Sequence, residues 1–539
     1  MKRQLLALLW TLALPGCHDL WGSLSGDNPL NCVVTPGICA ANESCDPALE
    51  RCLRVQDGGT AAEVVCPVMP CPAGQSCDVA AMRCVASPST LDVTAVRPRT
   101  GPLTGVSMAV IEGSGFKEPA SVLFGNLAAP AVSVLGPERL AVQIPAAAQP
   151  GLVSVKVSLD SGTRVSVTKE RLFGYAWSRP GFTTDPSLDP QGQTAGPLIL
   201  TDLNGDKRLD VAVAHGSRIS AFLGSGSGLG SAITTAGNGT MGAASGRFAA
   251  ARINQDAFTD LALLDPTAGN VIVLLSDGTG HFSVPIVTAV GTSTRDLALA
   301  DVDGDQRPDL LVLQDAPDQL VIYGGLGDGT FRTPALATIG EGRGPCSLAV
   351  GLFDADSRPD VAVVLCQAAE VRVRTNIGGT LLFGPPRSYF TQAGRATPRW
   401  IAAADMNADS RVDLIVSNSD QSTTGSFSVL LGQGTGEFAT ALTAATDTAT
   451  QEVFQVGDLD GDGFPDVIAA PSTGPIDAIR FLLGDGFGGL RSPQKVTVSG
   501  TTPNGLRVLA VGDVTGDDKP DILFTSAAPS VALLRNVSQ

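Results

Sequence analysis

Short apolar runs alternate with polar and glycine-rich turns along most of the chain, and from residue 177 onward this pattern repeats. In each repeat an apolar run such as LALA precedes an acidic loop, a second run such as LLVL follows it, and a third run ends in a Gly-rich turn and Phe. Apolar runs of this length between turn residues are typical of β-strands. We therefore expect three or four strands in every repeat.

The spacing of the acidic loops gives the number of repeats. Successive loops begin 50, 49, 51, 53, 53 and 55 residues apart, which makes seven units. Seven units with three or four strands each predict a seven-bladed β-propeller over residues 177–539. The units begin at Asp202, Arg252, Asp301, Leu352, Asp405, Asp458 and Asp513.

The last unit is incomplete at its C-terminal end. It stops at Gln539, where a Gly-Phe turn and a final strand would follow. Gly181 and Phe182 lie just before the first unit, and Phe182 precedes Asp202 by 20 residues, the distance found inside the repeats. We expect the strand at Phe182 to complete the last blade, because this closes the ring and removes exposed strand edges.

Composition agrees with an all-β protein of several domains. The 539 residues include 62 Gly and 36 Pro but only 5% aromatic residues, as expected for short strands joined by tight turns. A chain of this length usually divides into more than one core. The net charge of −17 argues against nucleic acid as a partner.

The first residues predict export from the cytoplasm. Met1, Lys2 and Arg3 precede an apolar run from Leu5 to Leu14, the order found in a secretory signal, and the run is too short to span a membrane. The segment LPGC that follows resembles the lipobox of bacterial lipoproteins. This resemblance implies cleavage after residue 16, a lipid on Cys17 that attaches the chain to a membrane, and a tether over residues 17–30. An ordinary signal peptide with a spare thiol is the alternative.

His18, rather than Asp, follows Cys17. In the lipoproteins that this segment resembles, an Asp at that place can retain the protein in the inner membrane. The resemblance therefore implies a location at the outer membrane, with the periplasmic or external side left open.

Residues 31–85 contain two copies of a small cysteine-rich module. The pieces CAANESCDPALERC and CPAGQSCDVAAMRC share Ser-Cys-Asp and Arg-Cys at matching positions. Four cysteines per copy in an exported chain predict disulfides of undetermined connectivity, and zinc is the alternative. The cysteines are Cys32, Cys39, Cys45 and Cys52 in one copy, and Cys66, Cys71, Cys77 and Cys84 in the other.

Residues 91–176 have short alternating strands of another kind. The segments IEGSGF, VLFG and FGY, with Val96-Arg97-Pro98 and Ile144-Pro145, resemble in order and spacing the immunoglobulin-like IPT/TIG family. This resemblance implies a β-sandwich, which in exported bacterial proteins usually serves as a spacer.

The acidic loops carry the strongest chemical signal. DVDGDQRPD at Asp301 recurs as DLDGDGFPD at Asp458, with carboxylates at positions 1, 3, 5 and 9. Such a loop offers oxygen ligands that calcium prefers, and the carboxylates would repel one another without a cation. The alternative is that Asp and Gly only favour a tight turn. The predicted ligands are Asp202, Asn204, Asp206, Asp210, Asp301, Asp303, Asp305, Asp309, Asp405, Asn407, Asp409, Asp413, Asp458, Asp460, Asp462, Asp466, Asp513, Thr515, Asp517 and Asp521.

Two units lack the first ligand. Arg252 stands in this position in RINQDAFTD, and Leu352 stands there in LFDADSRPD. An Arg can fill the metal position with its own charge, whereas a Leu removes a ligand. The sequence therefore predicts five calcium ions rather than seven.

The loops and their flanking strands resemble the FG-GAP and VCBS repeats of integrin α-subunit propellers and many bacterial surface proteins. The resemblance covers about two thirds of the chain, although the Phe-Gly and Gly-Ala-Pro motifs that give the family its name are only partly present. It implies structural calcium ions at one face of the propeller and ligand binding at the other face. It does not identify the ligand.

Cys346 and Cys366 lie at equal distances from Asp356 in the fourth loop. This symmetry places them on the two strands of one hairpin and predicts a cross-strand disulfide, with two buried free thiols as the alternative. The disulfide would hold together the blade that loses its calcium ligand at Leu352.

Binding is a better expectation than catalysis. Only His18, His215 and His281 are present, and none lies in a recognisable catalytic or metal motif. A closed propeller offers a rigid face with variable loops. We expect an adhesive or recognition protein with a glycan or protein ligand. A purely structural envelope scaffold is the alternative, and a polysaccharide lyase or hydrolase a more distant one.

Overall fold

A computed structural model describes the chain from the cysteine-rich modules to the C-terminus. Its described residues are 43–46, 51–54, 75–78, 83–86, 90–160, 165–177, 180–190, 195–236, 247–333, 335, 337–379, 382–391, 397–419, 425–446, 452–471, 478–497, 508–525 and 530–538. They form β-strands and no α-helix, so the all-β prediction is confirmed. Accordingly, they contain no helix long and apolar enough to cross a membrane. The predicted signal segment and Cys17 lie outside them.

Contacts divide the chain into two compact units. The first comprises Met1–Arg97, Met108–Gln143 and Val155–Lys169, and the second comprises Pro98–Ser107, Ile144–Ser154 and Glu170–Gln539. The boundaries between units therefore cut through residues 91–176 rather than falling only at their ends.

Each cysteine-rich copy contains one hairpin. Strands β1 (Glu43–Asp46) and β2 (Arg51–Arg54) pair with Cys45 opposite Cys52. Strands β3 (Gln75–Asp78) and β4 (Arg83–Ala86) pair with Cys77 opposite Cys84. The two copies thus share one backbone register, as their sequences indicate. Cys32, Cys39, Cys66 and Cys71 lie outside the described residues.

Residues 92–176 form two sheets with the strand orders β10-β11-β7-β5 and β6-β13-β12-β8-β9. Alternate side chains of these strands are buried, as in Ala109 and Ile111, because each sheet buries one face. The strands are β5 (Asp92–Arg97), β6 (Thr100–Pro102), β7 (Met108–Ser114), β8 (Ala120–Phe124), β9 (Leu127–Ala128), β10 (Val132–Gly136), β11 (Arg139–Gln143), β12 (Gly151–Leu159) and β13 (Val165–Ala176).

Residues 182–536 form seven four-stranded antiparallel sheets, here called blades and numbered by their acidic loops. Blades one to four contain β15 (Leu198–Thr201), β16 (Asp210–His215), β17 (Arg218–Phe222), β18 (Ile233–Ala236), β19 (Phe248–Ala251), β20 (Asp260–Asp265), β21 (Asn270–Leu274), β22 (Ile286–Ala289), β23 (Thr294–Ala300), β24 (Asp309–Asp315), β25 (Asp318–Tyr323), β26 (Ala337–Gly340), β27 (Pro345–Gly351), β28 (Asp360–Leu365), β29 (Glu370–Arg374) and β30 (Arg387–Phe390). Blades five to seven contain β31 (Thr397–Ala404), β32 (Asp413–Ser419), β33 (Ser426–Leu430), β34 (Leu442–Ala445), β35 (Glu452–Gly457), β36 (Asp466–Pro471), β37 (Ala478–Leu482), β38 (Gln494–Thr497), β39 (Val508–Gly512), β40 (Asp521–Thr525), β41 (Val531–Asn536) and β14 (Phe182–Leu188).

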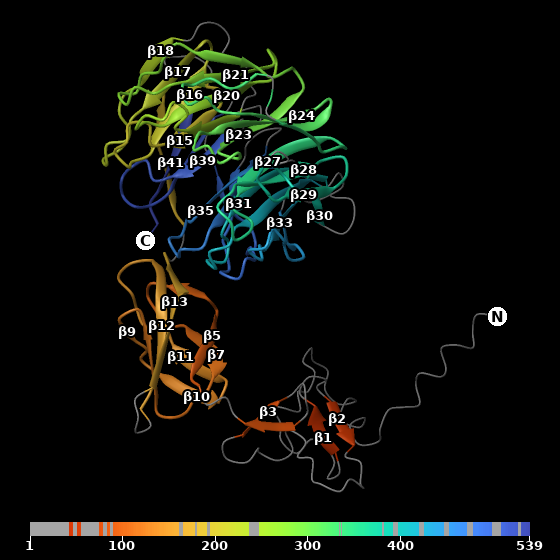
Figure 1. Cartoon of the computed structure of the whole chain (residues 1–539). Coiled ribbons are helices and arrows are strands. Elements are labelled where there is room, and N and C mark those ends of the chain that lie inside the picture. Colours follow the sequence, from red (N-terminus) through yellow and green to blue (C-terminus); the bar gives the residue numbers. More distant parts are fainter. Residues whose placement is uncertain are drawn as a thin grey trace, which may run out of the picture. The chain divides into compact units, whose positions relative to one another are not determined.

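The first strands of the blades contact one another in a closed cycle. Contacts join β15 to β19, β19 to β23, β23 to β27, β27 to β31, β31 to β35, β35 to β39, and β39 back to β15. The yellow-to-blue strands of Figure 1 are thus the blades of a β-propeller. The strand at Phe182 completes the last blade as predicted, because β14 pairs with β41 and places Phe182 opposite Asn536.

Apolar side chains between neighbouring blades form the core. Every residue of the second strands β16, β20, β28 and β36 is buried, because these strands are covered on both faces by adjacent blades. Ile219 of blade one packs in one cluster with Leu261 and Leu263 of blade two. The blades therefore hold one another in place, and the loops at their ends start from fixed points.

Candidate metal centre

All seven acidic loops occupy the same place in the fold. Each follows the first strand of its blade and leads into the second strand, as Asp301 follows β23 and Asp309 begins β24. Because the blades share one strand order around the ring, the loops lie at one face of the propeller.

The ninth residue of every loop is a buried Asp that binds backbone groups. Asp309 accepts hydrogen bonds from Val302 N at 2.9 Å and from Gly325 N at 2.9 Å. Equivalent pairs of bonds reach Asp210, Asp260, Asp360, Asp413, Asp466 and Asp521. This carboxylate links the loop to the end of the third strand in all seven blades, including the two that lack the first ligand. Sequence reasoning treated it only as a metal ligand and missed this second role.

The first carboxylate shapes the loop around itself. Asp301 Oδ1 accepts from Gly304 N at 2.7 Å, and its Oδ2 accepts from Gln306 N at 2.8 Å. The loops of Asp202, Asp405 and Asp513 show the same bond from the sixth residue. The turn therefore brings the backbone and the side chains at positions 1 and 3 around one point.

Two of the described loops gather three carboxylates each. One ligand oxygen from each of Asp301, Asp303 and Asp309 lies within 4.8 Å of the others, and so does one from each of Asp458, Asp460 and Asp466. In the loops of Asp202, Asp405 and Asp513 the third position is Asn or Thr, and the described residues there form no such carboxylate triple. The structure thus brings together positions 1, 3 and 9 of the two fully acidic loops.

The carboxylate at position 5 of each loop lies outside these two groups. Asp305 Oδ1 accepts from Arg307 N at 2.9 Å, and its Oδ2 lies 3.9 Å from the Arg307 guanidinium. Asp206, Asp409 and Asp517 make similar ion pairs with Arg208, Arg411 and Arg535. These pairs are exposed or half-exposed and contribute little to stability.

The loop of blade six is buried. Asp460 is 2% exposed and Asp462 is 1% exposed, and Trp177 N donates to the backbone oxygen of Asp460 at 2.9 Å. Among the described residues, Asp458 Oδ1 and Asp462 Oδ2 are buried and have no hydrogen-bond partner. Buried anionic oxygens without a partner are costly, so this loop fits a cation.

Burial changes the acidity of the loops. It raises the pKa of Asp309 and Asp458 to about 6, and that of Asp413 to about 7. Burial and then the charge of Asp460 raise the pKa of Asp462 to about 8. A bound divalent cation favours the ionised form and would reverse these shifts.

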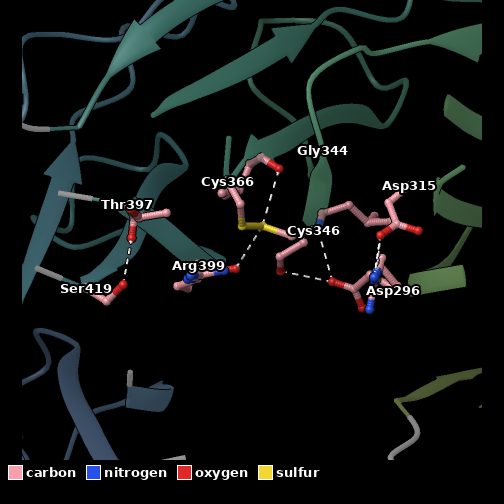
Figure 2. Close-up of a disulfide and its surroundings, with 12 residues drawn as sticks. Asp296, Asp315, Gly344, Cys346, Cys366, Thr397, Arg399 and Ser419 are labelled. Atoms are coloured by element: carbon pink, nitrogen blue, oxygen red, sulfur yellow. Dashed lines mark hydrogen bonds and ion pairs between the residues drawn. A yellow bond between two sulfur atoms is a disulfide. The ribbon is translucent and has the colours of Figure 1, made fainter. Parts of the chain in front are cut away.

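A disulfide joins Cys346 of β27 to the residue after β28, Cys366, which is the pair predicted from their symmetry about Asp356 (Figure 2). Cys346 Sγ lies 3.5 Å from the carbonyl oxygen of Arg399 in the next blade. The bond crosses the end of blade four opposite its acidic loop and closes the hairpin that contains Leu352.

Comparison with family models identifies two regions of the chain. Models described as FG-GAP-like repeat match residues 202–263, 252–312, 301–363, 405–469 and 458–524. A model described as IPT/TIG domain matches residues 91–170. No curated protein gives a significant match.

Several solved structures share parts of the chain's arrangement. They include a protein from Lactobacillus plantarum (14% identity, TM-score 0.42, covering 71% of this chain and 97% of that one). Another is a putative phosphatase from Bacteroides thetaiotaomicron (12% identity, TM-score 0.36, covering 83% of this chain and 98% of that one). A third is an auxiliary nutrient binding protein from Bacteroides ovatus (13% identity, TM-score 0.31, covering 83% of this chain and 98% of that one). These identities and TM-scores are low, and we draw no functional conclusion from them.

The family matches and the architecture agree. The FG-GAP-like matches cover more than half of the chain and fall on blades one to seven; three neighbouring pairs of matches overlap, each time at an acidic loop, whereas residues 364–404 lie between two matches. The TIG match covers the two sheets formed by residues 92–176. The chain therefore belongs to the family of FG-GAP-like repeat proteins and carries an IPT/TIG domain before its propeller.

Proposed function

We propose that this chain is a calcium-binding propeller protein of the bacterial cell envelope that recognises an extracellular glycan or protein ligand. The observation that carries the proposal is the buried loop of blade six, where Asp458 and Asp462 each have a carboxylate oxygen without a partner among the described residues. Carboxylates confined in this way need a cation, and an all-oxygen set of ligands suits calcium.

Calcium would be held at the five loops with a full set of oxygen ligands. Positions 1 and 3 provide side-chain oxygens, and the ninth Asp retains lone pairs beyond its two backbone bonds. The ion would neutralise the carboxylates and fix each loop against its blade. This role is structural, and it keeps the opposite ends of the strands in place for a ligand.

The blade ends opposite the acidic loops are the proposed recognition face. They start from buried strands of neighbouring blades, so their side chains are held rigidly, which lowers the entropy cost of binding. An adhesive or recognition role uses such a face directly, whereas a scaffold would need only the ring itself.

The N-terminal region is proposed as the anchor. A lipid on Cys17 would attach the chain to the outer membrane, and the cysteine-rich modules and the TIG domain would act as spacers. Cys17→Ser tests this proposal, because it should move the protein from the membrane to the soluble fraction of its host. Retention of the variant in the membrane fraction would overturn the lipid anchor.

A glycan array tests the recognition role. The full chain with Cys17→Ser is applied in millimolar calcium and again after chelation. We expect binding to a limited set of glycans that is lost with calcium. If folded, calcium-loaded protein binds no glycan and captures no cell-surface protein, the scaffold alternative replaces recognition.

A further inference from the structure

The starts of the first strands in blades three to five surround a cavity of about 440 Å³. Thr294 and Arg295 begin β23, Cys346 lies at the start of β27, and Arg399 and Trp400 lie at the start of β31. The acidic loops follow the other ends of these same strands. The cavity therefore lies at the face opposite the calcium loops, and its size is that of a small-ligand pocket.

Two polar groups in the cavity wall lack partners. Thr294 is 3% exposed, and its hydroxyl has no hydrogen-bond partner among the described residues. Arg399 Nε is likewise buried and unpartnered there. Unpaired buried polar groups are rare and costly, so a ligand group that reaches these two atoms after a small shift of the cavity wall would contribute to binding.

The residues that line the cavity carry more positive than negative charge. Arg295 already binds Asp315, with Arg295 Nε 2.6 Å from Asp315 Oδ2. In the described part of the chain, Arg399 has no carboxylate within ion-pair distance, and the cavity lining contains two guanidinium groups but one carboxylate. Since arginine only donates hydrogen bonds, the missing partner must be an acceptor, and a carboxylate suits it best.

A neighbouring ion pair does not supply that acceptor. Asp296 accepts from Ser347 Oγ at 2.9 Å and from Leu348 N at 3.0 Å, and it lies 3.5 Å from Arg247 Nε. Arg247 in turn stacks over the Trp400 ring, with its central carbon 4.0 Å from the ring centroid. Asp296 is thus engaged with blade four and with Arg247, and Trp400 is held in place as a firm apolar wall.

We propose that this cavity binds a carboxylated sugar, with Arg399 pairing the carboxylate of a uronic acid unit. Thr294 then meets a ring oxygen or hydroxyl, Asp315 accepts from a hydroxyl, and Trp400 contacts the apolar side of the ring. This inference rests on the proposed recognition function and names the class of ligand for it.

Calorimetry with a matched pair of sugars tests the inference. The full chain with Cys17→Ser, loaded with calcium, is titrated with sodium D-galacturonate and with D-galactose, which lacks the carboxylate. We expect galacturonate to bind at least tenfold more tightly. Equal affinity for the two sugars, or no binding of galacturonate, would overturn the inference.

Variants place the binding in this cavity. Arg399→Gln should weaken galacturonate at least tenfold and leave galactose unchanged, whereas Arg399→Lys should retain part of the affinity. Arg295→Gln at the exposed rim provides a second test that does not depend on a buried substitution. It leaves Asp315 without its ion-pair partner, so the free carboxylate repels the acidic sugar, and we expect galacturonate to bind several-fold more weakly. The control is Arg139→Gln, an exposed arginine of β11. Unchanged galacturonate affinity in both Arg399→Gln and Arg295→Gln would overturn the assignment.

The experiments distinguish a failure of the carboxylate-binding inference from a failure of the proposed recognition function. If the glycan array shows calcium-dependent binding to neutral glycans that Arg399→Gln leaves intact, the carboxylate inference is wrong and the recognition role stands. If the array shows no binding at all, the recognition role fails as well.

Discussion

Asp309 and Asp360 accept equivalent hydrogen bonds in neighbouring blades, although only the loop of Asp309 has the complete set of oxygen ligands predicted for calcium. Asp309 accepts from Val302 N and Gly325 N, and Asp360 accepts from Phe353 N at 2.8 Å and from Asn376 N at 2.7 Å. The ninth carboxylate therefore stabilises its blade whether or not a metal is bound. Substitutions at a chosen loop and position can therefore separate the role of a carboxylate as a metal ligand from its role in stabilising the blade.

Asp360→Asn should destabilise the propeller without removing calcium. The amide leaves one of two buried N–H donors without an acceptor, which costs about 1–3 kcal/mol. Denaturant unfolding measures the loss, and calorimetry measures the calcium stoichiometry. Asp301→Ala, which deletes the first ligand of the neighbouring loop, is the contrasting variant, and it should remove one calcium ion. If Asp360→Asn also removes an ion, loop four binds calcium and the count of five is wrong.

Leu352→Asp should create a sixth calcium site. Leu352 is 48% exposed at the first position of a loop that keeps Asp354, Asp356 and Asp360, so the substitution restores the missing ligand at little cost to the core. Calcium titration should show one additional ion per chain. Val287→Asp, which changes another exposed apolar residue on β22, should leave the count as in the parent protein. If Leu352→Asp binds the same number of calcium ions as the parent protein, the missing first ligand is not what prevents loop four from binding calcium.

Stability of the metal-free protein should fall as the pH rises. Burial raises the pKa of Asp413 from 3.8 to about 7 and that of Asp462 to about 8. Below the unfolded value both groups are protonated in both states. Between the unfolded value and the raised values, the unfolded chain has already released these protons while the folded chain still holds them, so the free energy of unfolding falls as the pH rises and levels off above the raised values. Denaturant unfolding between pH 5 and about pH 8 in chelator measures this trend.

Calcium should suppress that trend, because the bound ion stabilises the ionised carboxylates. The same unfolding series in millimolar calcium is the control. A metal-free protein that becomes more stable over this pH range would contradict the burial of uncompensated carboxylates.

Removal of the disulfide should destabilise blade four. The bond spans 20 residues, and a closed loop of this length contributes about 3 kcal/mol by restricting the unfolded chain. Cys346→Ala combined with Cys366→Ala should therefore lower the unfolding midpoint while the number of calcium ions stays the same. An unchanged midpoint would show that packing between blades alone holds this hairpin.

Much of the fold could be predicted because the sequence of each repeat contains the signals for its own strands and turns. The apolar run at Leu310 becomes β24, the acidic loop at Asp301 separates β23 from β24, and the spacing of Phe182 from Asp202 predicts its pairing with β41. Each of these patterns lies within about one repeat of sequence. The second role of the ninth Asp was not visible, because its partner Gly325 N belongs to the Gly-rich turn 16 residues away, and the sequence does not show that this turn lies against the acidic loop.

The proposed recognition cavity could not be predicted. Thr294 comes from blade three, whereas Arg399 and Trp400 come from blade five, and no motif joins the two places in the sequence. Only the ring brings them together, and the lack of a partner for Arg399 Nε among the described residues is visible only once its surroundings are known. A comparison of the residues at the starts of all first strands would have been the nearest available signal.

The calcium content of the folded chain tests the account most directly. Native mass spectrometry of the full chain with Cys17→Ser, equilibrated with millimolar calcium, should show five ions per molecule that chelation removes, together with a fall in the unfolding temperature. A folded protein that carries no calcium under these conditions, and whose unfolding temperature is the same with and without chelator, would contradict the assignment of the acidic loops as metal centres.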